Sequence, residues 1–425
     1  MERTGRLSRF YWDIVYRDDA SASFCWACGL FAVFLLFPGG GSGGSIVGIG
    51  IWLFALLNWA FDRRGRHFDE IERPIIAAFS AYCLVMVVFA VSHHVVHGSK
   101  GGFGAVYGNL LFIFFAPVMP VLRQAVRPYW LETFFAANAC GAILAVLIMV
   151  IGGPFSQELL RGALSGNPLI LALGAVVSGL LCVHGLLFFK GRMRLLLAIG
   201  ALAALYALVS SGSRGPLLAY CITLAAYALV MGYRYFGLRF MAVRAGIAAL
   251  IVALLAVGVI KADPELTNRI ELAIERISNP DGEAVGEQSI SVRLALYRAG
   301  LSAFGERPLT GYGRQNVMQT AALHDPQQGA RFSFSHLHNG YLTDLVASGI
   351  LGLVTLLAVF LVPLYVLRKA PPVVFGALFC TVLSYMLYGM SNLLFYHDVS
   401  TLYYLSLITA FCVLARLPER GGEVY

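Results

Sequence analysis

Two arginines and a pair of histidines are the residues of this chain whose types and positions could do chemistry on a phosphate. Arg214 lies in the segment SSGSRGPLLAY (210–220), where glycines and a proline on either side of it predict a turn into a helix N-terminus. Backbone N–H groups and a guanidinium converge at such a turn, which favours an anion such as phosphate. Ser213, directly before Arg214, is a candidate contact to the same anion.

A second guanidinium comes from Arg161, in the segment FSQELLRGALSGN (155–167). This segment is a short polar stretch between two apolar runs, so Arg161 could join Arg214 on one anion. An arginine at this position could equally pair with Glu158, or extend its side chain to the membrane surface. The sequence leaves both interpretations open.

The segment SFSHLHNGYLTD (333–344) places His336, His338 and Asn339 directly before an apolar run. Two histidines separated by one residue could bind a metal, but no HExxH motif, DxD motif or acidic cluster supplies a third ligand, so we predict no metal site. A neutral histidine can instead take a proton near neutral pH, which suits activation of a hydroxyl group. A structural role for both histidines is the alternative.

The composition indicates which solvent surrounds these residues. Of 425 residues, 59% are hydrophobic and only 13% are charged, which leaves too little polar surface for a soluble fold. Apolar stretches of about 17 to 25 residues recur along the whole chain, the length needed for a helix to cross a bilayer. We therefore predict an all-α integral membrane protein.

Twelve transmembrane helices are predicted from these stretches, with short helices in one large extramembrane loop. They divide the chain into helices 1 to 9 (residues 1–260), the loop (261–340), and helices 10 to 12 with a short tail (341–425). The predicted spans are 21–38, 45–61, 74–92, 104–122, 131–151, 168–189, 195–211, 215–233, 240–260, 341–367, 372–393 and 399–415.

Positive charge in the short loops predicts the orientation. Short loops on one side carry almost all the Lys and Arg, whereas those on the other side carry only Lys100, Arg161 and Arg214. The side rich in Lys and Arg is expected to be cytoplasmic and to hold both termini. The net charge of +8 is spread over these loops rather than gathered on one face, so nucleic acid is not a predicted partner.

The large loop lies on the outer side with the candidate residues. Apolar residues recur at helical spacing over 263–277 and again over 289–304, and the polar stretch 278–288 separates them. Arginines and histidines at the outer membrane surface suit transfer of a group from a membrane-held phosphate or pyrophosphate. A transporter is the competing class, but its polar residues should lie near the bilayer midplane on broken helices.

Three motifs, in this order, resemble the O-antigen ligase and Wzy polymerase superfamily. They are SGSRG (211–215), SVRLALYRAGLSAFGERPLTGYG (291–313), and HLHNGYL with the following GILG (336–352). The resemblance covers roughly the second half of the chain. It implies a membrane fold similar to the GT-C glycosyltransferases, and a metal-independent, cofactor-independent glycosyltransferase of the bacterial inner membrane.

The resemblance also implies substrates. The donor would be a glycan linked to undecaprenyl pyrophosphate, used on the periplasmic side among membrane lipids. In ligases the acceptor is a sugar hydroxyl of the lipid A core, whereas in polymerases it is another lipid-linked repeat. The chain ends soon after its last span, while protein-glycosylating relatives usually carry a soluble C-terminal region, so we favour the ligase.

Roles for individual residues follow from the resemblance. Arg214 and Arg161 would bind the donor pyrophosphate and stabilise the leaving group, and His338 would orient or deprotonate the acceptor hydroxyl. Arg293 could join the anion site, although a salt bridge to a glutamate of the loop is an equal alternative. The remaining predicted contacts to substrate are His336, Asn339 and Ser213.

Overall fold

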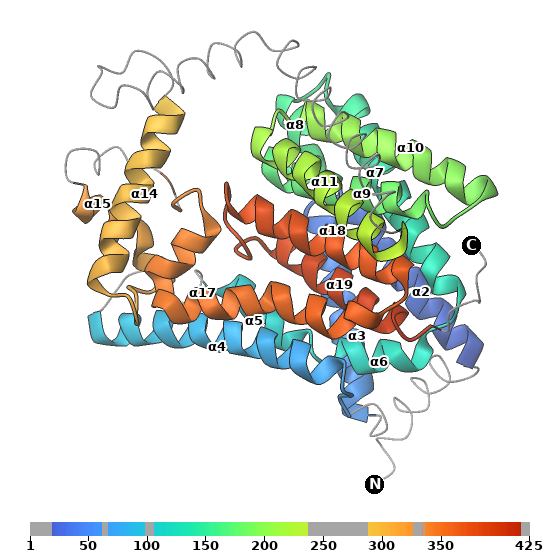
Figure 1. Ribbon diagram of the computed structural model, residues 1–425, viewed down its shortest axis with the longest axis horizontal. Coiled ribbons are helices and arrows are strands. Elements are labelled where there is room, and N and C mark those ends of the chain that lie inside the picture. The colour runs from blue at the N-terminus through green and yellow to red at the C-terminus, as the bar shows by residue number, and fades with distance from the viewer. Residues whose placement is uncertain are drawn as a thin grey trace.

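The computed structural model describes residues 19–61, 67–97, 106–236, 288–325, 334 and 336–417. All regular structure within these ranges is helical (Figure 1). The α-helices are α2 (Asp19–Leu36), α3 (Ser42–Phe61), α4 (Glu72–His97), α5 (Tyr107–Phe114), α6 (Val118–Ala125), α7 (Tyr129–Gly152), α8 (Gln157–Gly162), α9 (Pro168–Gly185), α10 (Gly191–Ser210), α11 (Arg214–Phe236), α14 (Gln288–Glu306), α15 (Val317–His324), α17 (Gly340–Val366), α18 (Pro372–Gly389) and α19 (Asp398–Leu414).

Eight of the described helices are long and apolar enough to cross a membrane, or nine if the bent pair α5 and α6 forms one span. The prediction of an all-α membrane protein is confirmed, but the predicted count of twelve spans is not. Helices α2 and α19 match two predicted spans but have apolar parts of less than 18 residues, and the predicted span 240–260 lies outside the described residues.

The short helix α19 lies at the centre of the bundle. Every residue from Val399 to Leu414 is buried, so protein rather than lipid surrounds this helix. Tyr404 is fully buried, and its hydroxyl donates a hydrogen bond to the carbonyl oxygen of Val359 in α17 at 2.9 Å. A helix enclosed in this way is held by packing and does not need the length of a lipid-facing span.

A network of four charged residues ties together the end of the bundle where α19 finishes. Arg123 of α6 contacts the carboxylates of Asp69 at 3.1 Å and Glu72 at 3.0 Å. Arg416, just after α19, pairs with Asp69 and lies 3.2 Å from Glu72, whose side chain is fully buried. These loops belong to the side that the charge pattern predicts to be cytoplasmic.

Helices α14 and α15 lie at the opposite end of the bundle, beside the start of α17 (Figure 1). The predicted helix 289–304 is confirmed as α14, whereas α15 was not predicted and the predicted helix 263–277 lies outside the described residues. The segment between α14 and α15 contains the Gly-x-Gly of the second motif.

This segment docks into a kink in α17. Ser348 and Gly349 leave the helical conformation, which frees backbone groups of the preceding turn. The N–H of Tyr312 donates to the carbonyl oxygen of Val346 at 2.9 Å, and the N–H of Gly313 donates to that of Ala347 at 2.8 Å. Backbone groups at membrane depth need partners within the protein, so the two motifs form one structural unit.

Gly311 is required where this unit closes. Its φ is +59°, and an added β-carbon would lie 2.5 Å from the carbonyl carbon of Ala347. We expect Gly311→Ala to destabilise the protein by about 2 to 4 kcal/mol through backbone strain and overpacking.

Gly166 supplies the matched control, because its φ is +63° but no atom lies within 4 Å of an added β-carbon. Gly166→Ala should cost only about 1 kcal/mol. Thermal unfolding in detergent measures both variants. Equal shifts would show that the contact with α17 contributes nothing.

Candidate functional site

Arg161 and the turn before Arg214 meet in the structure. Nη2 of Arg161 donates to the carbonyl oxygen of Ser211 at 3.2 Å, and a β-carbon on Gly212 would lie 3.0 Å from the same nitrogen. The turn itself forms because Gly212 has a φ of +66° and the hydroxyl of Ser211 accepts the N–H of Ser213 at 3.2 Å.

Both guanidinium-bearing side chains are exposed at this turn. Arg214 is the first residue of α11, so it lies at the N-terminal end of that helix. Ser156 caps the preceding short helix α8 by accepting the N–H of Glu158 at 3.2 Å. The hydrogen bonds of Arg161 go to the carbonyl oxygen of Ser211 and not to Glu158, so the alternative of a pair with Glu158 is not observed.

The histidine segment forms the second half of the site. Asn339 caps α17, where its side-chain oxygen accepts the N–H of Leu342 at 3.0 Å. The rings of His336 and His338 are packed together, with centroids 4.6 Å apart. His338 has a φ of +53°, a conformation that costs a non-glycine residue about 1 kcal/mol.

Helix α14 covers this segment and contributes two further residues. The hydroxyl of Tyr297 donates to the carbonyl oxygen of His338 at 3.2 Å and also bonds the side chain of Asn339. Arg293, exposed one turn earlier on α14, is close enough for its charge to lower the pKa of His338. Four predicted residues, Arg293, His336, His338 and Asn339, are therefore brought together.

The electrostatic setting keeps both histidines neutral at about pH 7. Burial is the main cause that lowers the pKa of His338, and the positive charge of Arg293 adds to it. For His336, burial and the neighbouring charges of His338, His397, Arg314 and Arg293 lower the pKa to about 4. His338 is half-buried, whereas His336 lies deeper.

Arg293 gives a test of this setting. Removing its charge should raise the pKa of His338, so the acid side of an activity profile should move to higher pH in Arg293→Gln. Initial rates between about pH 5 and 8 measure the shift. Arg298→Gln removes an exposed arginine from the same helix and should leave the profile unchanged; a shift shared by both variants would point to a general surface effect.

The loop between α18 and α19, residues 390–397, connects the two halves. A β-carbon on Gly215, in the first turn of α11, would lie 2.5 Å from Oγ of Ser391. A β-carbon on Gly340, the first residue of α17, would lie 3.0 Å from the carbonyl oxygen of Asn392. The arginine turn and the histidine segment therefore pack on adjacent residues of one loop, which lies between α11 and α17 (Figure 1).

Sequence reasoning missed a buried ion pair beside this loop. Nη1 of Arg314 lies 3.5 Å from Oδ1 of Asp344, and both side chains are almost fully buried. The hydroxyl of Tyr82 donates to Oδ2 of Asp344 at 2.7 Å. An ionisable residue inside an apolar span is costly and needs a partner, so Asp344 in the segment 341–352 was the available signal.

His184, which the sequence places inside a span, is held by neighbouring helices instead. Its Nε2 lies 2.7 Å from the carbonyl oxygen of Val373, which can only accept, so this nitrogen carries the hydrogen. Nδ1 then accepts from the hydroxyl of Tyr227 at 2.6 Å. Both ring nitrogens form hydrogen bonds within the bundle, which indicates a structural role for His184.

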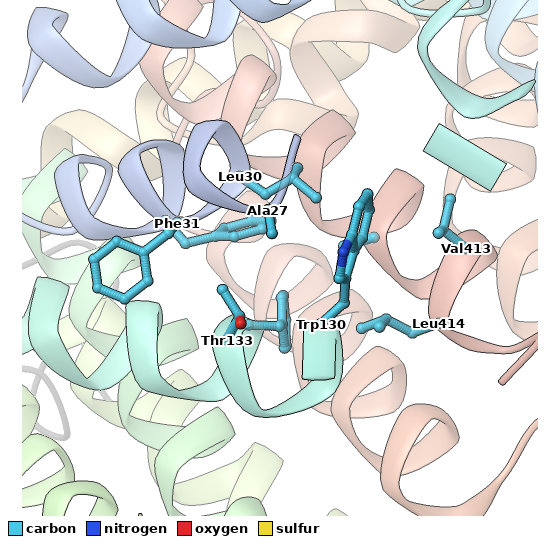
Figure 2. A pocket seen from close by; sticks show the side chains of 10 residues that line it. Ala27, Leu30, Phe31, Trp130, Thr133, Val413 and Leu414 are labelled. Atoms are coloured by element: carbon cyan, nitrogen blue, oxygen red, sulfur yellow. The ribbon is translucent and has the colours of Figure 1, made fainter. Parts of the chain in front are cut away.

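Among the described residues, no group of three or more His, Cys, Asp or Glu side chains is arranged to hold a metal ion. A small apolar hollow lies elsewhere, between α2, α7 and α19 (Figure 2). Trp130, in the first turn of α7, and Leu414, at the end of α19, border it, so it lies at the end of the bundle opposite to His338. It contains no ionisable side chain and offers no group for catalysis.

The family model described as O-antigen ligase matches residues 199–357 of the chain. The matched region includes the turn at Arg214, Arg293 on α14, and the segment of His338, and the resemblance seen in the motifs is confirmed there. No curated protein is similar enough to the sequence to count as a match. Enzymes of this family act on glycans carried by membrane lipids, and the candidate spans agree with a multi-pass membrane protein.

Proposed function

We propose that this chain, whose residues 199–357 carry the domain of the O-antigen ligase family, joins a glycan from undecaprenyl pyrophosphate to a sugar hydroxyl of the lipid A core. The observation that carries the proposal is the junction at the α18–α19 loop. There the turn of Arg161 and Arg214 packs on Ser391, and the histidine segment packs on Asn392. A group that binds pyrophosphate thus adjoins a group that can accept a proton.

The proposed reaction is a single displacement without a metal. The acceptor hydroxyl attacks the anomeric carbon on the face opposite to the pyrophosphate, and the new C–O bond forms as the bond to the pyrophosphate oxygen breaks. The leaving pyrophosphate takes the electron pair, and Arg214 and Arg161 stabilise its charge. The proton of the acceptor hydroxyl moves to the neutral imidazole of His338. This course inverts the anomeric centre.

The proposed location is the inner membrane of a bacterium, with cytoplasmic termini and a periplasmic site. The distribution of arginines supports this orientation. The end of the bundle opposite to His338 holds Arg123, Arg192, Arg194 and Arg416, as expected of a cytoplasmic side. The donor's lipid tail would reach a site at the membrane surface directly from the bilayer.

Transfer by the purified full-length chain tests the proposal. A lipid-linked glycan donor and lipid A core are incubated with the protein and EDTA, and NMR of the product gives its anomeric configuration. We expect transfer to lipid A core with inversion. Extension of the donor without transfer to lipid A core would assign the chain to the polymerases instead, and absence of both reactions, with donor movement across vesicles, would favour a transporter.

A further inference from the structure

Arg314 is a buried cation that no motif of the sequence pointed to. It begins a short 3₁₀ turn directly after the Gly-x-Gly segment that docks into α17, and only 7% of its surface is exposed. Besides the ion pair with Asp344, its Nη1 donates to Oδ1 of Asn109 at 3.3 Å. Its Nη2 donates to the carbonyl oxygen of Leu394 at 3.0 Å.

These contacts join three parts of the fold at one guanidinium. Asn109 belongs to α5, Asp344 to α17, and Leu394 to the α18–α19 loop on which both halves of the site pack. The next residue of the loop, Phe395, has a φ of +50°, and a β-carbon on Gly108 would lie 2.8 Å from its carbonyl oxygen. Surrounding elements therefore impose the shape of this loop, and Arg314 supplies the polar contact to it.

The charge of Arg314 also acts on two histidines. For His336, burial lowers the pKa first, followed by the charges of His338, His397, Arg314 and Arg293. For His397, burial and Arg314 lower the pKa, whereas the adjacent Asp398 raises it. Asp344, 3.5 Å from Nη1, is the acidic partner of Arg314.

We propose that Arg314 is a positioning residue of the transfer site, which fixes the α18–α19 loop through Leu394 and keeps a positive charge beside His336 and His397. This inference rests on the proposed function. Arg314 adds to burial in favouring the neutral forms of His336 and His397, so that a second cation beside His338 is disfavoured at His336 when His338 takes the acceptor proton.

A purely structural ion pair could be exchanged for neutral side chains with little loss, because burying two charges costs about as much as their attraction returns. The variant Arg314→Met combined with Asp344→Asn removes both charges, leaves no unpaired buried ion, and retains an acceptor for the hydroxyl of Tyr82. Arg314→Lys keeps the charge but cannot make the forked contact to Asn109 and Leu394 together.

The experiment measures the protonation of the two histidines directly, in addition to the rate of transfer. Diethyl pyrocarbonate modifies a histidine only through its neutral ring, and mass spectrometry of the modified full-length protein over a range of pH gives a midpoint for His336 and for His397. In the double variant we expect both midpoints to move to higher pH and transfer at about pH 7 to fall by about tenfold or more. Arg314→Lys should keep the midpoints of the unsubstituted protein and lose several-fold in rate.

Arg307→Met is the control, since Arg307 lies in the same segment but stacks on the exposed side of Tyr312, 4.8 Å from its ring. Thermal unfolding in detergent verifies that the variants are folded. A folded double variant with unchanged midpoints and rate would overturn the inference. If the double variant does not fold, an unchanged rate in Arg314→Lys overturns the role of the forked contact. Absence of transfer by the unsubstituted protein would instead refute the proposed function, while the midpoints still report on the charge of Arg314.

Discussion

Replacing His338 with asparagine is expected to lower the rate of glycan transfer by about 10²- to 10⁴-fold, the usual contribution of a general base. Asparagine is the informative substitution because His338 has a φ of +53°, which asparagine tolerates better than most residues. Alanine would lose the ring and also strain the backbone before α17. The KM for the donor should change little, since the turn of the arginines proposed to bind its pyrophosphate packs on the loop at Ser391 and the histidine segment packs on it at Asn392.

His324→Asn provides the matched control, because His324 ends α15, where its Nε2 lies 3.0 Å from the carboxylate of Glu306 at the end of α14. It should transfer glycan at nearly the rate of the unsubstituted protein. His336→Asn should lose less than His338→Asn, since burial and neighbouring positive charges hold its pKa at about 4 and leave it a weak base. A folded His338→Asn protein with full activity would exclude His338 as the base and direct attention to the other histidines.

The elements of the fold were largely predictable because apolar runs of the length of a membrane have few alternatives. Eleven predicted spans have helical counterparts, from α2 to α19, and the twelfth, 240–260, lies outside the described residues. Hydropathy could not distinguish a helix that crosses lipid from a helix that is enclosed by protein. The buried α19 and the broken pair α5 and α6 are as apolar as true spans, yet their length and bend depend on their neighbours.

The halves of the site were predictable, but their junction was not. Glycines before Arg214 and the capping Asn339 before α17 are local signals, and the structure follows both. The α18–α19 loop joins the halves through Ser391 and Asn392, residues of ordinary type in a stretch that periodicity cannot interpret. Contacts between segments far apart in the sequence are decided by packing.

The second motif shows the same limit in another form. Its Gly-x-Gly could be recognised as part of the resemblance, yet the reason for the two glycines appears only beside the kink in α17. The motif delivers Arg314 to Asp344, and neither residue was predicted. The motif thus identifies a structural unit, but Arg314, the residue that connects this unit to Asp344, lies directly after the motif.

Arg214→Ala is expected to lower the rate of transfer by about 10²- to 10³-fold. The rate of Arg214→Lys is expected to lie between those of Arg214→Ala and the unsubstituted protein. The leaving pyrophosphate gains negative charge as the anomeric bond breaks, so a guanidinium aimed at it acts most strongly in the transition state. Lysine keeps a point charge but loses the planar, two-pronged contact that suits phosphate oxygens. Single-turnover rates with the lipid-linked donor separate this effect from donor binding.

Arg192→Ala is the appropriate control, since Arg192 is also an exposed arginine in the first turn of a helix. That helix, α10, begins at the opposite end of the bundle and leads directly into the turn before Arg214. Equal losses in Arg192→Ala and Arg214→Ala would indicate a general effect of surface charge. The loss of rate in Arg161→Ala should lie between the losses in Arg192→Ala and Arg214→Ala. Arg161 donates to the carbonyl oxygen of Ser211, so it acts partly by holding the turn before Arg214. A loss confined to Arg161 and Arg214 would identify this turn as the group that carries the leaving pyrophosphate.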